Sequence, residues 1–215
     1  MTVVHYIAKD AGIAIAETAA GLSAIHRPDC AAALWQRAPL PAFQTWIDAL
    51  DPQQLPNARV ILSPNRVHEA VTQICDVSGT PDGGERAMLA DDAAALADIF
   101  AGLMDASYLR LRFDVVETNA CRKFHVDSIV ARLICTYRGT GTQYGNAFDG
   151  DEPEQFFTAP AGSPLVLRGK LWRPDSCFGL LHRSPPIEGT GETRLLLVLD
   201  PITDPDNHPE PKLIG

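Results

Sequence analysis

The spacing of the apolar residues changes at Tyr108, and this change constrains the fold more than any other feature. In the run YLRLRFDVVE that begins there, Leu109, Leu111 and Phe113 alternate with charged residues. An alternation with a period of two predicts a strand with one buried face. The segments that follow, up to Asp200, are short and are separated by Gly, Pro, Asn and Asp. Short strands without helices between them predict an antiparallel sandwich or barrel.

The first half of the chain has helical spacing instead. Ser63 and Pro64 are typical of the start of a helix that should end near Gly79, and an alanine-rich stretch further on carries one apolar stripe. The expected helices cover residues 28–37, 43–50, 63–79 and 89–106, and the expected strands cover residues 108–117, 123–137, 164–172, 178–183 and 193–200.

These patterns predict a single domain of the α+β class. N-terminal helices are expected to pack on a C-terminal double-stranded β-helix, which is a cupin-like jelly roll. The helical part covers residues 1–107 and the jelly roll covers residues 108–200. Residues 201–215 are rich in Pro and Asp and are expected to form an irregular tail.

Charge and composition disfavour several classes of function. The chain has 18 basic and 27 acidic side chains, a net charge of −9, whereas surfaces that bind nucleic acid are basic. The start MTVVHYIAKDAG is not a secretory signal, and no apolar run reaches about 18 residues, so we expect neither export nor membrane contact. Five widely spaced cysteines are typical of reduced thiols and of a cytoplasmic protein.

Three side chains have the chemistry of a metal site. In the run CRKFHVDSIV, His125 and Asp127 are two residues apart in an extended segment, so they should point to the same side. His182 stands at the end of another extended run, FGLLHRSPP. Two histidines and one carboxylate that leave three positions open form the ligand set of non-haem Fe(II) oxygenases.

Arg194 is the candidate anchor for an anionic cosubstrate. It is the charged residue in the middle of TRLLLVLD, and a guanidinium among leucines is unfavourable unless an acceptor meets it. The turn before it can bring it back to the level of His182. A structural ion pair with Asp127 or Glu192 is the alternative. Arg132 is a competing anchor, although, counted from Asp127, it falls on the opposite face of the strand unless a bulge or bend intervenes.

These residues together resemble a known superfamily. HVD, the later HRS and the downstream TRLLL are similar to the His-x-Asp, distal His and Arg pattern of the Fe(II)/2-oxoglutarate dioxygenases. TYRGTGTQY and GSPLVLRGKLW also resemble segments of that superfamily, and the resemblance covers about ninety residues, from Tyr108 to Asp200. It implies that His125, Asp127 and His182 bind Fe(II), and that Arg194 binds 2-oxoglutarate with help from the hydroxyl of Tyr137.

A closer resemblance covers the chain as a whole. IHRPDC near the start, CRKFHVD in the middle and HRSPP late are similar to the bacterial family called domain of unknown function 1826. The family name brings no activity with it, but the resemblance implies a connection with zinc homeostasis.

Cysteine supplies a second possible ligand set. Cys121, His125, Cys177 and His182 could form a closed tetrahedral zinc site, which would be structural or metal-storing. The competing functions are therefore an oxygenase that hydroxylates or oxidises a small molecule or a protein, a non-enzymatic metal-binding accessory protein on the same scaffold, and a scaffold that has lost catalysis. The sequence names neither the substrate nor the oligomeric state.

Overall fold

A computed structural model describes residues 4–6, 12–146, 152–172 and 180–204 of the chain. The helices are α1 (Pro41–Ala49), α2 (Val67–Ser78) and α3 (Gly84–Met104), with short 3-10 helices η1 (Ala19–His26), η2 (Pro52–Gln54) and η3 (Pro64–Arg66). The strands are β1 (Val4–Tyr6), β2 (Ile13–Ala16), β3 (Ala32–Trp35), β4 (Ala58–Leu62), β5 (Tyr108–Val116), β6 (Ala131–Arg138), β7 (Gln143–Asn146), β8 (Phe157–Thr158), β9 (Leu165–Arg168), β10 (Leu180–Arg183) and β11 (Arg194–Ile202). The mixed helix and strand class predicted from the sequence is confirmed.

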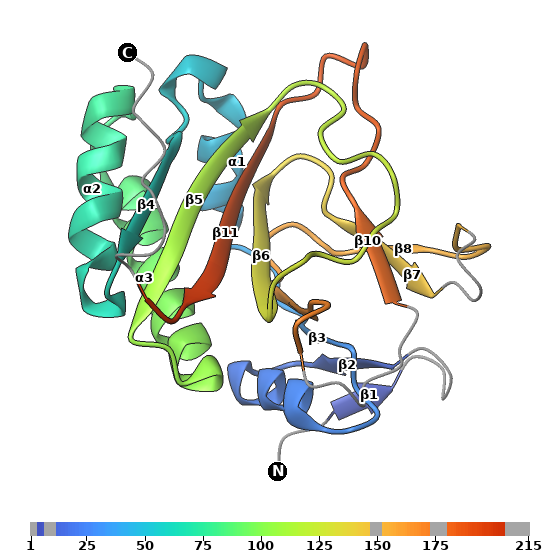
Figure 1. Ribbon diagram of the computed structural model, residues 1–215. Coiled ribbons are helices and arrows are strands. Elements are labelled where there is room, and N and C mark those ends of the chain that lie inside the picture. The colour runs from blue at the N-terminus through green and yellow to red at the C-terminus, as the bar shows by residue number, and fades with distance from the viewer. Residues whose placement is uncertain (1–3, 7–11, 147–151, 173–179, 205–215) are drawn as a thin grey trace.

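The strands form two sheets. The larger sheet has eight strands in the order β1-β2-β3-β9-β6-β11-β5-β4, and the smaller has three in the order β10-β7-β8. The smaller sheet lies to the right of β6 in Figure 1, whereas β5 and β4 lie to the left of β6. β11 pairs with β5 along its whole length, from Arg194 opposite Val116 to Ile202 opposite Tyr108.

From β5 to β11 the first strand pairs with the last, and the following segments pair in the same nested order. β5 pairs with β11, and a bridge at His125 pairs with His182 in β10. β6 then pairs with β9, and β7 pairs with β8. This order makes neighbours of segments that are far apart in the chain, and it brings the bridge residue to β10.

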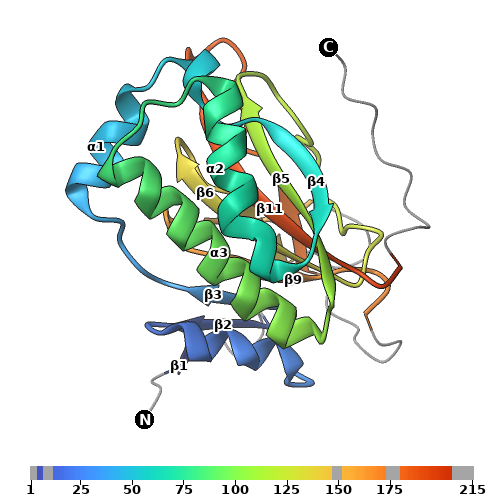
Figure 2. The same cartoon turned by 90° about the vertical axis from the view of Figure 1, so that its left-hand side faces the viewer.

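The two faces of the larger sheet have different surroundings. Leu111, Leu133 and Leu197 belong to the main core, which includes the apolar side chains of α1, α2 and α3. Figure 2 shows α2 and α3 crossing this side, which we call the helix face. Ile134 and Leu196 belong to a second core shared with the smaller sheet, on the side we call the inner face. Because strand side chains alternate, even-numbered residues of β5 and β11 lie on the inner face. The even-numbered residues of β6 do so up to Thr136, before the register shift opposite Leu195 and Leu196.

Local sequence explains where α2 ends. Gly79 has a φ of 68°, a left-handed conformation that glycine adopts without a steric penalty, and its amide donates to the carbonyl of Asp76. The next amide, that of Thr80, donates to the carbonyl of Cys75. The predicted helices at residues 43–50, 63–79 and 89–106 correspond to α1, to η3 with α2, and to α3.

The prediction of a helix over residues 28–37 is wrong. Residues 32–35 form β3, which pairs in parallel with β2 and antiparallel with β9. Ala32 and Ala33 are fully buried, so sheet pairing and burial override the helix preference of alanine. β1, β2 and β4 are further strands in the part expected to be helical.

The later segments follow the prediction with shifted boundaries. The strand expected over residues 123–137 begins only at Ala131, and the residues before it are irregular apart from the bridge at His125. Pro201 and Ile202, expected in the tail, still belong to β11, and residues 205–215 lie outside the described part of the chain. Across the residues that the structure describes, none of the helices has the length and apolar character that a membrane crossing requires.

Candidate metal centre

Two histidines from distant parts of the chain lie side by side. The backbone amide of His125 donates to the carbonyl of His182, and the reverse bond is also present, both with N–O distances of 3.0 Å. Side chains of directly paired residues leave the ladder on the same side. The two ring centroids are accordingly 4.6 Å apart.

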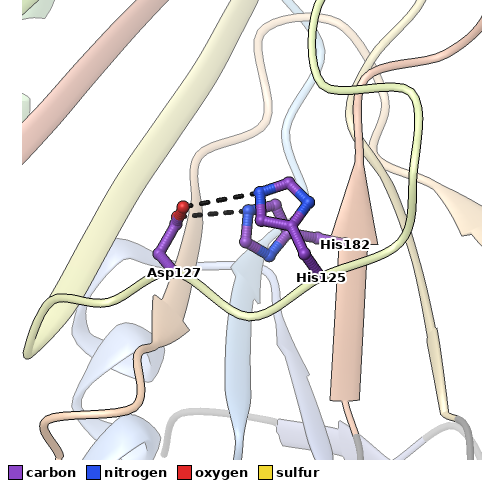
Figure 3. Close-up of side chains that lie close together, drawn as sticks. All are labelled: His125, Asp127 and His182. Carbon is purple, nitrogen blue, oxygen red and sulfur yellow. Dashed lines mark ion pairs between the residues drawn. The ribbon is translucent and has the colours of Figure 1, made fainter. Parts of the chain in front are cut away.

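A carboxylate completes the group. Oδ1 of Asp127 is 3.5 Å from Nε2 of His125, and Oδ2 is 3.2 Å from Nε2 of His182 (Figure 3). One ligand atom from each residue lies within 4.8 Å of the others, and no other group in the described part of the chain meets this condition. The structure therefore brings the three predicted ligands to one point.

Hydrogen bonding fixes which nitrogen of His125 can bind a metal. Its Nδ1 lies 2.8 Å from the carbonyl oxygen of Lys123. A carbonyl only accepts, so Nδ1 carries the proton and the lone pair is on Nε2, the nitrogen that faces Asp127.

Arg132 holds the carboxylate in position. Its Nη1 donates to Oδ2 of Asp127 at 2.7 Å, while Nε and Nη2 donate to the two carboxylate oxygens of Asp200 at 2.7 and 2.9 Å. The two hydrogen bonds to Asp200 fix the guanidinium, and the guanidinium in turn fixes one oxygen of Asp127. Such outer contacts orient the ligands of a metal and tune its affinity.

The protonation states suit a cation. Burial raises the pKa of Asp127, but the hydrogen bond with His182 and the charges of His182, Arg132 and His125 outweigh this effect. The pKa is lowered to about 2. Burial lowers the pKa of His182 below its usual value of 6.5, against the opposing effect of Asp127. At neutral pH the carboxylate is ionised and the imidazole of His182 is neutral, which are the forms that bind metals.

Arg194 is buried with most of its hydrogen-bonding capacity unused. Its Nε donates to the carbonyl of Thr140 at 2.6 Å, but Nη1 and Nη2 are buried and have no partner among the described residues. Burial lowers its pKa to about 10, with Glu192 opposing the shift. Its pairing partner Val116 packs against the second core, so Arg194 lies on the inner face. The ion pairs expected as alternatives, with Asp127 or Glu192, are absent from the described contacts.

Tyr137 does not lie with Arg194. Its hydroxyl donates to Oδ2 of Asp92 at 2.7 Å, and its ring packs against Phe43 and Phe113 in the main core. The physical reason is strand alternation, because odd-numbered residues of β6 point to the helix face. Its predicted role beside the cosubstrate is therefore corrected.

Tyr144 is the tyrosine that the sequence interpretation missed. In β7 it lies directly opposite His182, belongs to the second core and is 3% exposed. Burial raises the pKa of its hydroxyl, which therefore stays protonated at neutral pH and can donate a hydrogen bond. The run TYRGTGTQY contains both tyrosines. Only the pairing register distinguishes them.

Arg132 lies on the same side as Asp127, which is the exception that the sequence prediction allowed for a bulge or bend. Residues 128–130 form a bend instead of a strand. An irregular segment breaks the alternation on which the opposite-face prediction depended. Arg132 is engaged by two carboxylates, so it is a support for the ligand Asp127 and not a competing anion anchor.

The cysteines do not join the group in the described structure. Cys121 is exposed and is not part of the metal-binding group, although its carbonyl accepts from the amide of Ser184. Cys177, the other thiol of the predicted zinc set, lies outside the described residues. Cys135 is fully buried, and burial raises the pKa of its thiol to about 12, as suits a small apolar core residue.

Two histidines and a carboxylate on a mixed helix and strand fold define a candidate non-haem metal protein. The family model described as Protein of unknown function (DUF1826) matches residues 16–200. The chain belongs to this family, and the resemblance seen in the sequence is confirmed. No curated protein matches the chain.

The solved structures to which the chain is similar include a dioxygenase and a member of the 2OG-Fe(II) oxygenase family. The dioxygenase for auxin oxidation from rice is 14% identical, with a TM-score of 0.49, and 87% of this chain and 79% of that chain are covered. A 2OG-Fe(II) oxygenase family oxidoreductase from Burkholderia pseudomallei is 11% identical, with a TM-score of 0.42 and coverage of 85% and 90%. At identities this low, function has to be inferred from the site residues.

Proposed function

We propose that this protein is an Fe(II)/2-oxoglutarate-dependent oxygenase. One observation carries the proposal: a group of His125, Asp127 and His182 occurs in the same protein as a buried arginine, Arg194, whose two terminal nitrogens have no partner among the described residues. The first group suits Fe(II), and the second suits an anionic cosubstrate.

The strand order supports a double-stranded β-helix as the scaffold. From β5 onward the bridge at His125 counts as the second strand of eight, and the pairs are then first with eighth, second with seventh, third with sixth and fourth with fifth. A long antiparallel ribbon wrapped around itself pairs in this way, and a jelly roll is such a ribbon. The predicted ligands come from the second and seventh strands and from the residues just after the second.

The donor set favours a catalytic ion over a structural one. Three protein ligands leave coordination positions open, whereas structural zinc is normally closed by four. Two imidazoles and one carboxylate suit Fe(II), and His182 and Asp127 already have the required protonation states. When bound together, Fe(II) and 2-oxoglutarate supply the oxidising chemistry, in which oxygen is consumed and succinate and carbon dioxide are released.

The residues of the inner face would bind and orient the cosubstrate. The unused Nη1 and Nη2 of Arg194 match the two oxygens of a carboxylate, and the hydroxyl of Thr136 is also buried without a partner among the described residues. Thr136 lies on β6 directly opposite Leu196, which is two residues along β11 from Arg194. The phenol of Tyr144 beside His182 is a further hydrogen-bond donor, and the apolar second core excludes water.

Succinate release tests the proposal. The protein, purified without air, is supplied with Fe(II), 2-oxoglutarate and oxygen, and succinate is measured in the absence of a second substrate. We expect slow turnover that falls at least about 100-fold in Asp127→Ala, which removes a ligand, and in Arg194→Met, which removes the anchor. Cys121→Ser is the control and should retain turnover, because this exposed thiol is not in the group.

Two results would contradict the oxygenase. Turnover that survives Asp127→Ala would show that the three-residue group does not carry the reaction. A wild-type protein that binds zinc stoichiometrically and releases no succinate would favour the metal-binding accessory protein, and zinc lost from both Cys121→Ser and Cys177→Ser would favour the closed zinc site.

A further inference from the structure

Positive charge is concentrated on the inner face of the larger sheet, beyond the smaller sheet. Arg110 and Arg112 are even-numbered residues of β5 and lie on this face. In the register of β4 with β5, Arg59 is opposite Arg112, so Arg59 points to the same side. We call Arg59, Arg110 and Arg112 the arginine row. In Figure 1, β4 and β5 lie on the opposite side of β11 and β6 from the smaller sheet.

Two members of the row, Arg59 and Arg112, have donor groups without a partner among the described residues. Arg59 is exposed and makes no ion pair within the described part of the chain. Arg112 lies 3.3 Å from Asp114, but its Nε is buried and has no hydrogen-bond partner among the described residues. The third member, Arg110, has partners, among them Asp200 at 4.0 Å, which Arg132 also contacts with two hydrogen bonds. A cluster of guanidiniums is unexpected in a chain with a net charge of −9.

Repulsion within the row is visible in one of its members. The pKa of Arg110 is lowered first by burial and then by the charge of Arg59, with Arg112 and Arg132 adding to the effect against Asp200. Like charges that lower one another's pKa are stabilised when an anion lies between them. Such local conflicts are typical of functional sites.

The row is connected to the candidate metal centre. Asp127 contacts Arg132 at 2.7 Å, Arg132 contacts Asp200 at 2.7 Å, and Asp200 faces Arg110 at 4.0 Å. All of these side chains lie on the same side of the larger sheet as the metal-binding group. A small molecule held by the row could therefore extend toward the three ligands.

We propose that the arginine row binds the acidic group of the substrate, which is a small carboxylate- or phosphate-bearing molecule. The identification of the bound molecule as a substrate rests on the proposed oxygenase function, whereas anion binding at the row does not require iron. Guanidinium groups bind both kinds of anion through paired N–H donors, and the unused Nε of Arg112 supplies one of these donors. The acidic end would be fixed at the row and the reacting carbon would face the metal ligands.

Anion binding by the full-length, metal-free protein tests the inference. Inorganic phosphate and acetate are titrated separately against chloride at constant ionic strength, and the arginine Nε–H signals are followed by NMR. We expect a saturable shift of the Arg112 signal with one of the two anions. Saturation by phosphate identifies a phosphate ester as the substrate class, and saturation by acetate identifies a carboxylate.

Three substitutions locate the site. Arg112→Gln and Arg59→Gln should each weaken binding at least about tenfold, since each removes a charged donor. Arg59 is exposed, so its variant should fold even if the Arg112 variant does not. Arg66→Gln is the matched control, because Arg66 is paired with Glu69 at 2.9 Å and contacts the groove beside α2 instead of the row.

The inference is overturned if neither anion saturates the Arg112 signal above chloride. It is equally overturned if Arg59→Gln leaves the dissociation constant unchanged, or if Arg66→Gln weakens binding as much. Because iron and 2-oxoglutarate are left out, a negative result here says nothing about succinate release. Conversely, a protein that releases no succinate can still bind phosphate or acetate at the row.

Discussion

Replacing Arg194 by methionine should change stability and cosubstrate affinity in opposite directions. Burial lowers the pKa of Arg194 from 12.5 to about 10. At about 1.36 kcal/mol per pKa unit, holding this charge in the ligand-free protein costs about 3 kcal/mol. Arginine is charged at neutral pH in both the folded and unfolded states, so the full cost applies there, and it is relieved only as the pH rises through 10.

Methionine removes that cost and fills similar space with apolar atoms. The hydrogen bond from Nε to the Thr140 carbonyl is lost, which costs about 1 kcal/mol, so the net gain is about 2 kcal/mol. For a chain of this size we expect the melting temperature of ligand-free Arg194→Met to rise by about 4 °C or more. The dissociation constant for 2-oxoglutarate should increase at least about 100-fold, because two charge-assisted hydrogen bonds disappear.

Thermal unfolding without ligand and calorimetric titration of 2-oxoglutarate into the anaerobic Fe(II) protein measure the two effects. Arg138→Met is the matched control, because Nη1 of Arg138 donates to the carbonyl of Leu50 at 2.7 Å and its loss should lower the melting temperature. A lower melting temperature for Arg194→Met would refute the claim that this guanidinium is kept at a cost. An unchanged affinity for 2-oxoglutarate would refute its role as the anchor.

The other predictions concern ligand geometry and burial. Arg132→Met should weaken Fe(II) binding about 10- to 100-fold in a metal titration, because it frees Asp127 to rotate. A Cβ at Gly169 would lie 2.0 Å from the backbone oxygen two residues after Asp127, so Gly169→Ala should lower both the melting temperature and metal affinity. Gly102→Ala in α3, with nothing within 4 Å, should leave metal affinity unchanged and raise stability by about 0.5–1 kcal/mol. Cys135, with a thiol pKa of about 12, should resist alkylation at pH 8 until the protein unfolds, as mass spectrometry can detect.

The sequence predicted that His125, Asp127 and His182 lie together, but by a route that is only partly right. Alternation on a strand was expected to align His125 with Asp127, but neither residue lies in a named strand. The backbone bridge between His125 and His182 aligns the two rings, and Arg132 fixes the carboxylate. The residue types were readable because their chemistry is unusual in that context. The contacts that align them are not local in sequence.

Counting residues along a strand failed wherever the backbone departs from a strand. It placed Arg132 opposite Asp127 unless a bulge or bend intervened, and residues 128–130 do bend. It selected Tyr137 and missed Tyr144, because the register of β7 with β10 is a long-range property. The segment 28–37 failed for a related reason. Its alanines have a local preference for helix, but two neighbouring strands with distant sequences convert residues 32–35 into β3.

The hydrogen bonds of Arg132 and Arg194 distinguish a side chain that supports other residues from one that is available to a ligand. Both lie on the inner face, yet all the guanidinium nitrogens of Arg132 donate to carboxylates of the protein, whereas two of the three in Arg194 have no partner among the described residues. A guanidinium held by two carboxylates has its charge already compensated, whereas one that is buried without an anion destabilises the fold until an anion binds. The sequence alone treats the two as competing anchors. The hydrogen-bond pattern pairs Arg132 with Asp127, and this supports Arg194 as the proposed anchor of the cosubstrate.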